Sequence, residues 1–141
     1  YLIDNAVKLS FVRFDNETTG CFAGTAASAL RVASVDEVFK TKALVCAERS
    51  KTRDWFDLYV LMTRHGFGAV DIHRAFVEAD RTRSFDIAAS RIRKCVPGKT
   101  DEGYVQLLEL APSLDEMRDF FNRELDQLEI NLSRAAFKAQ R

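Results

Sequence analysis

The sequence predicts an α+β protein that is predominantly α-helical, with a short β segment followed by a helical bundle. Residues 7–14 begin by alternating apolar and polar side chains with period two, which is typical of a strand. Two Ser-x-x-Glu capping boxes, Ser34 to Glu37 and Ser113 to Glu116, each predict a helix start. Apolar residues then recur at steps of three and four, which predicts amphipathic helices.

The composition is that of a globular protein. The 141 residues are 47% hydrophobic and 30% charged, which suits one domain or a large part of one. With 21 basic and 21 acidic residues, the charge balance does not indicate broad electrostatic capture of nucleic acid.

The cysteine spacing and the hydropathy of the sequence indicate where in the cell the protein is located. Cys21, Cys46 and Cys95 are widely spaced without a C-x-x-C motif, so we expect reduced thiols and a cytoplasmic protein. No apolar run approaches the roughly 18 residues that would predict a membrane span. The chain starts at Tyr1 without a signal-peptide pattern, and we expect this start to be cut from something longer.

The predicted β segment comes first. Val7, Leu9 and Phe11 would share one face of a strand over residues 7–14, and residues 15–20 read as a loop. Residues 30–33 are a candidate second short strand.

The first two predicted helices carry the clearest signals. Ser34 caps a helix over residues 35–48, in which Val35, Phe39, Ala43 and Cys46 recur at helical spacing. Thr52 is expected to cap the next helix, and Gly66 to end it in the left-handed conformation. The buried stripe of this second helix is expected to be Trp55, Leu58, Tyr59 and Met62.

Further helices are expected over residues 70–79, 84–95 and 104–110, and from Ser113 onward. Ser84 is the predicted cap of the second of these, with Phe85, Ile87, Ala88 and Ile92 as its buried positions. The last helix has a continuous apolar stripe formed by Met117, Phe121, Leu125, Leu128 and Leu132, which Phe120 widens. The result is a bundle of five or six helices.

Several common catalytic motifs are absent from the sequence. It contains no D-x-D, no H-E-x-x-H, no P-loop and no G-x-G-x-x-G. His65 and His73 are expected at a helix cap and on the surface rather than on a metal. A basic cluster could contact RNA, although a solvated helix face is the favoured interpretation; it comprises Arg81, Arg83, Arg91, Arg93 and Lys94.

The stretch from Phe39 to Leu58 concentrates charges of both signs between apolar residues. Lys42 and Arg49 lie seven apart on one helical face, and Arg53, Asp54 and Asp57 crowd the start of the next helix. One interpretation is phosphate binding by Lys42 and Arg49, with the aspartates orienting them. The other is an ion-pair network that joins two helices.

In this stretch the sequence resembles the AbiEii/AbiGii toxin family of nucleotidyltransferases. The family pattern has a helical lysine, an arginine seven residues later, a basic residue, and R-D-x-x-D-L opening the next helix. Here the pattern is Lys42, Arg49, Lys51 and the segment 53–58, and residues 32–37 fit the family's lead-in. The strand at residues 7–11 fits a late strand of the catalytic sheet more loosely.

The resemblance implies a bacterial protein of a toxin–antitoxin or abortive-infection system that transfers a nucleotide from an NTP to an acceptor such as RNA, with Mg²⁺. It implies that residues 1–33 are a remnant of the sheet of a polymerase-β-type nucleotidyltransferase, and residues 34–141 a C-terminal helical domain. Lys42, Arg49 and Arg53 would bind the nucleotide, and Asp54 and Asp57 would be the catalytic aspartates that orient them or assist the acceptor.

The family's G-[GS] loop and metal-binding D-x-D pair are missing here, so we expect this chain to be inactive on its own. The residues carried over from the family include no metal ligand. The alternative is a non-catalytic helical module that binds an antitoxin or RNA. A third possibility is a purely structural charge cluster.

Overall fold

The structure is a computed structural model that describes residues 2–3, 7–8, 32–99, 101 and 111–139. Within these residues it contains five helices, so the predominantly helical prediction is confirmed. Its two strands, β1 (Leu2–Ile3) and β2 (Val7–Lys8), pair antiparallel with Leu2 opposite Lys8. Two residues per strand do not show the predicted sheet remnant, and residues 9–14 and 104–110 lie outside the described part of the chain. Residues 32 and 33 are not in a strand.

Helix α2 (Val35–Val45) begins at the predicted capping box. The Glu37 amide donates to Ser34 Oγ at 3.2 Å, and the Ser34 amide donates to Glu37 Oε2 at 2.8 Å. The helix ends three residues before the predicted position 48, because its last amides bond three residues back and tighten the chain into a turn. Phe39 and Ala43 are buried as predicted, whereas Val35 is exposed in the first turn.

Helix α3 (Thr52–His65) corrects one predicted cap and confirms another. Thr52 is the first helical residue and Lys51 occupies the cap position without a side-chain hydrogen bond. Gly66 ends the helix with φ of 76°, the left-handed conformation that favours glycine. Trp55, Leu58 and Met62 are buried and Tyr59 is partly buried against them, which confirms the predicted stripe.

Helices α4 (Ala69–Glu78) and α5 (Thr82–Lys94) follow as an adjacent pair. The predicted cap at Ser84 is wrong, because α5 begins two residues earlier and Ser84 lies in its first turn. Ile87 is 49% exposed rather than buried. The buried face of α5 is formed by Ala88, Ala89 and Ile92. Because consecutive residues are about 100° apart around a helix, Ile87 lies off this face although it directly precedes Ala88.

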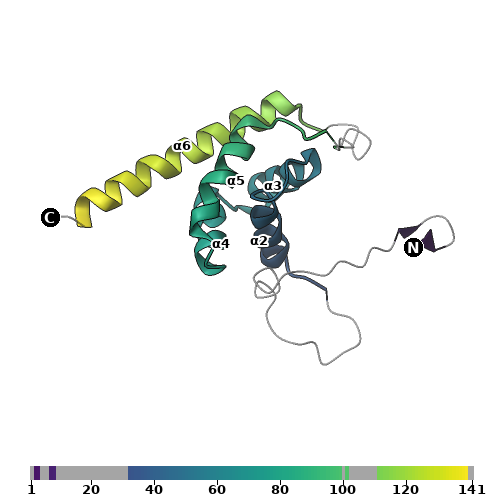
Figure 1. Ribbon diagram of the computed structural model, residues 1–141, viewed down its shortest axis with the longest axis horizontal. Coiled ribbons are helices and arrows are strands. Elements are labelled where there is room, and N and C mark those ends of the chain that lie inside the picture. Colours follow the sequence, from purple (N-terminus) through teal and green to yellow (C-terminus); the bar gives the residue numbers. More distant parts are fainter. Residues whose placement is uncertain (1, 4–6, 9–31, 100, 102–110, 140–141) are drawn as a thin grey trace.

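Helix α6 (Leu114–Ala139) is the long last helix, and it starts at the second predicted capping box. Its stripe is buried from Met117 through Leu128, but Leu132 is 41% exposed. Residues 129–139 are all exposed, since the end of α6 extends past the helices on which it packs (Figure 1).

The helices form one core. Helix α2 packs on α3 and α4, and α6 packs on α3, α4 and α5. The largest fully buried side chains include aromatic residues from four helices: Phe39, Trp55, Phe76 and Phe121. This packing brings the end of α2 beside the start of α3, where the predicted site residues lie.

Candidate functional site

The junction between α2 and α3 brings together four of the five predicted site residues. Lys42 comes from the last turn of α2, Arg49 from the connection, and Asp54 and Asp57 from the first turns of α3. The predicted shared helical face of Lys42 and Arg49 is wrong, because α2 ends at Val45 and the chain turns before it reaches Arg49. Lys42 Nζ lies 3.1 Å from Asp54 Oδ1 and 2.6 Å from Asp57 Oδ2. Arg49 donates two parallel hydrogen bonds to Asp54, from Nε to Oδ2 at 2.8 Å and from Nη2 to Oδ1 at 3.1 Å. We call these four residues the junction cluster.

Asp54 is the buried centre of the junction cluster. Its side chain is 1% exposed, and it accepts three hydrogen bonds from two cations. A buried carboxylate is tolerated when it is paired and hydrogen-bonded in this way. Asp54 therefore holds Lys42 and Arg49 in fixed positions at the end of α2.

The electrostatics follow from this pairing. Burial alone would raise the pKa of Asp54, but the hydrogen bonds and charges of Arg49 and Lys42 outweigh it and lower that pKa. Burial likewise opposes the charge of Lys42, yet Asp57 and Asp54 raise its pKa overall. The Asp54 hydrogen bond raises the pKa of Arg49. All three groups are therefore charged at neutral pH.

The side chains of the two cations in the junction cluster are partly exposed to solvent. Arg49 is 51% exposed, and Nη1 takes no part in its contacts with Asp54. Lys42 is 27% exposed and Asp57 38% exposed. The cluster therefore presents N–H donors to solvent while its central carboxylate is buried, and donors of this kind bind phosphate oxygens.

The remaining predicted residues lie elsewhere. Arg53 has an exposed side chain in the first turn of α3, and its role stays a prediction. His65 is exposed in the last turn of α3, and His73 packs edge-on against Phe85 at 5.0 Å. Within residues 32–99, 101 and 111–139, no group of three or more potential metal-ligating side chains comes together.

The structure adds two residues that sequence patterns did not indicate at this site. Arg91 of α5 donates to the carbonyl oxygens of Ala47 and Cys46, at 2.5 and 3.4 Å. Asp101 accepts from the Thr52 amide at 3.3 Å and from the Thr52 hydroxyl. They lie more than 40 residues from their partners, so no local signal could have identified them.

Most side chains of the basic cluster on and beside α5 form ion pairs or hydrogen bonds within the molecule. Arg81 pairs with Glu48 at 3.1 Å, Arg91 makes the carbonyl contacts above, and Arg93 pairs with Asp126 at 2.6 Å. Arg83 and Lys94 are exposed. Intramolecular pairing of three of these side chains favours the structural interpretation of the cluster.

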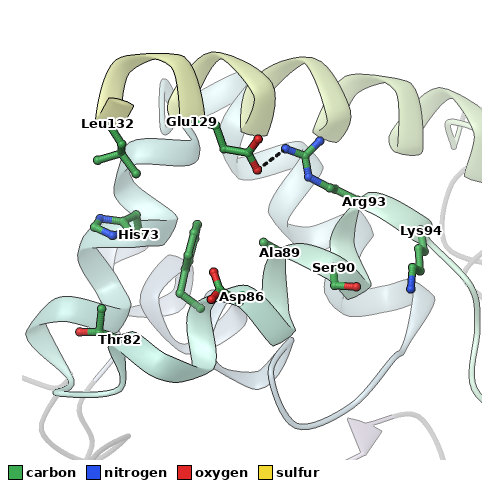
Figure 2. Close-up of a pocket in the computed structure, with 10 residues that line it drawn as sticks. His73, Thr82, Asp86, Ala89, Ser90, Arg93, Lys94, Glu129 and Leu132 are labelled. Atoms are coloured by element: carbon green, nitrogen blue, oxygen red, sulfur yellow. Dashed lines mark hydrogen bonds and ion pairs between the residues drawn. The ribbon is translucent and has the colours of Figure 1, made fainter. Parts of the chain in front are cut away.

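An open groove of about 470 Å³ lies between α4, α5 and α6, away from the junction cluster (Figure 2). Its polar lining includes His73, Asp86 and Ser90. Arg93 extends across its edge toward Glu129, at 2.7 Å, so this guanidinium is already paired (Figure 2). None of the predicted site residues lines the groove.

Comparison with protein families matches residues 4–140 to the family described as "Nucleotidyl transferase AbiEii toxin, Type IV TA system". No curated protein and no solved structure matches the chain. Among the described helices, none is long and apolar enough to cross a membrane.

Proposed function

Because the chain belongs to the AbiEii family of nucleotidyltransferase toxins, we propose that its junction cluster forms part of the site that binds a nucleoside triphosphate. The reaction would transfer a nucleotide from the NTP to an acceptor, with RNA as the expected acceptor class. One observation carries the proposal: Asp54 is fully buried, yet it holds an arginine that is half exposed. The buried carboxylate therefore fixes the arginine while part of its guanidinium remains accessible to a ligand.

Each member of the cluster has a distinct proposed role. Arg49 would contact phosphate oxygens through the guanidinium edge that Asp54 leaves unused, and Lys42 would add a point charge beside it. Arg53, exposed in the first turn of α3, would extend the basic surface toward the nucleotide. Asp54 would orient the two cations, and the half-exposed carboxylate of Asp57 would assist the acceptor.

Mg²⁺ is implied by the family, but the described residues do not fit it. Both oxygens of Asp54 accept from Arg49 and Lys42, and Asp57 is paired with Lys42. Two-metal phosphoryl transfer needs carboxylates that are free to hold cations, and the sequence has no D-x-D pair. We therefore propose that this chain binds the triphosphate end of the NTP and does not complete the transfer on its own.

The wider context is also part of the proposal. Residues 1–33 would belong to a polymerase-β-type catalytic sheet, with residues 34–141 as the helical domain beside it. The protein would act in the bacterial cytoplasm together with a cognate antitoxin. In the competing function, the same helical domain binds an antitoxin or RNA without chemistry.

Thermal shift measurements with ATP, CTP, GTP and UTP, each with MgCl₂, test the proposal. At least one NTP should raise the Tm of the natural protein, and Lys42→Ala and Arg49→Ala should each abolish the shift relative to the variant's own Tm. Arg83→Ala is the matched control, because this arginine is exposed on α5 and lies outside the cluster. If no NTP shifts the Tm, or if the two cluster variants keep the shift, the junction cluster is not a nucleotide site.

A further inference from the structure

The connection between α2 and α3 carries Arg49 and is held at both ends by residues that follow it by about 45 positions. Arg49 lies two residues after Ala47 and three residues before Thr52. Ala47 is contacted by Arg91, and Thr52 by Asp101. These contacts come from α5 and from the chain that follows it, so a separate part of the fold determines how Arg49 is presented.

The contact at the first end matches the chemistry of a helix C-terminus. The final carbonyl groups of α2 lack partners within the helix and carry its negative dipole end. Arg91 Nη1 donates to the carbonyls of Ala47 and Cys46 at 2.5 and 3.4 Å, so a cation pairs with two acceptors in the turn that follows α2. Its side chain is partly buried, which strengthens a charge-assisted hydrogen bond.

The contact at the second end matches the chemistry of a helix N-terminus. Lys51 provides no side-chain cap for α3, and the Asp101 carboxylate accepts from the Thr52 amide and hydroxyl instead. Between the two ends, the Gly98 amide donates to the Ser50 carbonyl at 3.0 Å. A Cβ at position 98 would lie 3.2 Å from that carbonyl oxygen, so the approach is close.

We infer that Arg91 and Asp101 are positioning residues that fix the α2–α3 connection so that Arg49 meets Asp54 with its free edge toward the nucleotide. The inference deepens the proposed function and rests on it. Arg49 is exposed and its connection has few buried anchors of its own, since Glu48 and Arg49 both face solvent. Without the contacts of Arg91 and Asp101, the connection would keep only the Gly98–Ser50 and Arg81–Glu48 contacts from outside, and the bidentate geometry would be one arrangement among several.

The affinity of the responsive NTP with MgCl₂, measured by isothermal titration, tests the inference. Arg91→Gln should weaken binding about tenfold, which corresponds to the free energy of one charge-assisted hydrogen bond. Asp101→Asn should also weaken binding. Arg91→Lys keeps a cation for the Ala47 carbonyl and should restore most of the affinity. Arg83→Gln is the matched control on the same helix and should bind like the natural protein.

A double-mutant cycle separates positioning from general stabilisation. If Arg91 acts through Arg49, Arg91→Gln should cost little further affinity once Arg49→Lys, which keeps a charge but loses the bidentate pair, is present, although it still lowers the Tm. An equal loss in both backgrounds, or a lower Tm with unchanged affinity, would overturn the inference.

A readout without nucleotide keeps this inference distinct from the proposed function. The Nε–H resonance of Arg49 in ¹⁵N NMR spectra reports directly on its bond to Asp54. Arg91→Gln should broaden or shift this resonance, whereas Arg83→Gln should leave it in place. If no NTP binds but the resonance responds as expected, the nucleotide role fails and the positioning role stands; an unchanged resonance refutes the positioning role.

Discussion

Replacing Asp54 with asparagine should destabilise the fold far more than the same replacement at Asp57. The two aspartates belong to one cluster and share Lys42 as a partner. They differ in burial, because Asp54 is 1% exposed and Asp57 is 38% exposed. The comparison therefore tests the combined effect of burying a carboxylate and pairing it with two cations.

The magnitude follows from the contacts. Asp54→Asn would place an amide N–H₂ where an oxygen now accepts from Arg49 or Lys42, so cations and donors would face each other. Breaking a buried ion pair costs about 3–5 kcal/mol, and we expect about 3 kcal/mol because Arg49 can regain water. Asp57→Asn removes one contact at a half-exposed site, which is worth about 0.5 kcal/mol.

Urea unfolding followed by circular dichroism measures both free energies of unfolding. Asp86→Asn is the matched control, since this carboxylate is exposed on α5 and lies outside the cluster. It should change the free energy of unfolding by less than about 0.5 kcal/mol. Equal losses for the Asp54 and Asp57 variants would refute the argument that burial makes Asp54 the structural centre of the cluster.

Two further outcomes are expected. The lowered pKa of Asp54 means that its contribution to stability is present above its ordinary value of 3.8 and is lost as the pH falls through the lower folded value. The raised pKa of Lys42 means that its contribution is present below 10.5 and is lost as the pH rises through the higher folded value. The stability difference between the natural protein and Asp54→Asn, measured by urea unfolding, should therefore stay level between about pH 5 and pH 9 and shrink below about pH 3.8; growth of the difference in acid would contradict the sign. Gly66→Ala should cost about 1 kcal/mol by the same assay, because φ is 76° while nothing lies within 4 Å of the added Cβ; a neutral substitution would mean that this residue leaves the left-handed conformation.

Local chemistry made the helical part of the fold predictable. Both capping boxes are formed, because a serine hydroxyl and a glutamate three residues later satisfy each other's neighbouring amides within one turn. Gly66 ends α3 for an equally local reason. The buried stripe of α6 followed from its helical spacing as far as Leu128, but spacing could not show that Leu132 lies beyond the helices that cover the stripe.

Two of the wrong predictions concern residues whose surroundings are set by parts of the chain distant in sequence. Thr52 looked like a cap because threonine commonly accepts from its own first turn, yet its hydroxyl is engaged by Asp101. Ile87 looked buried because it is apolar, but the rotation of α5 about its axis places the predicted Ala88 and Ile92 against the core and leaves Ile87 exposed. Neither a helix's rotation about its axis nor a partner 49 residues away is encoded in local spacing.

The sequence by itself indicated most of the junction cluster, because Lys42 and the R-D-x-x-D pattern lie at neighbouring helix ends, although Arg49 lies in the connection and not on the helical face that its spacing from Lys42 predicted. The tertiary structure alone decided what the cluster is: a buried Asp54 that holds a half-exposed Arg49 in a connection anchored by Arg91 and Asp101. The physical reason is that burial and long-range hydrogen bonds depend on how helices pack, and packing determines whether a charged side chain is a solvated surface group or is held in one position by its partners.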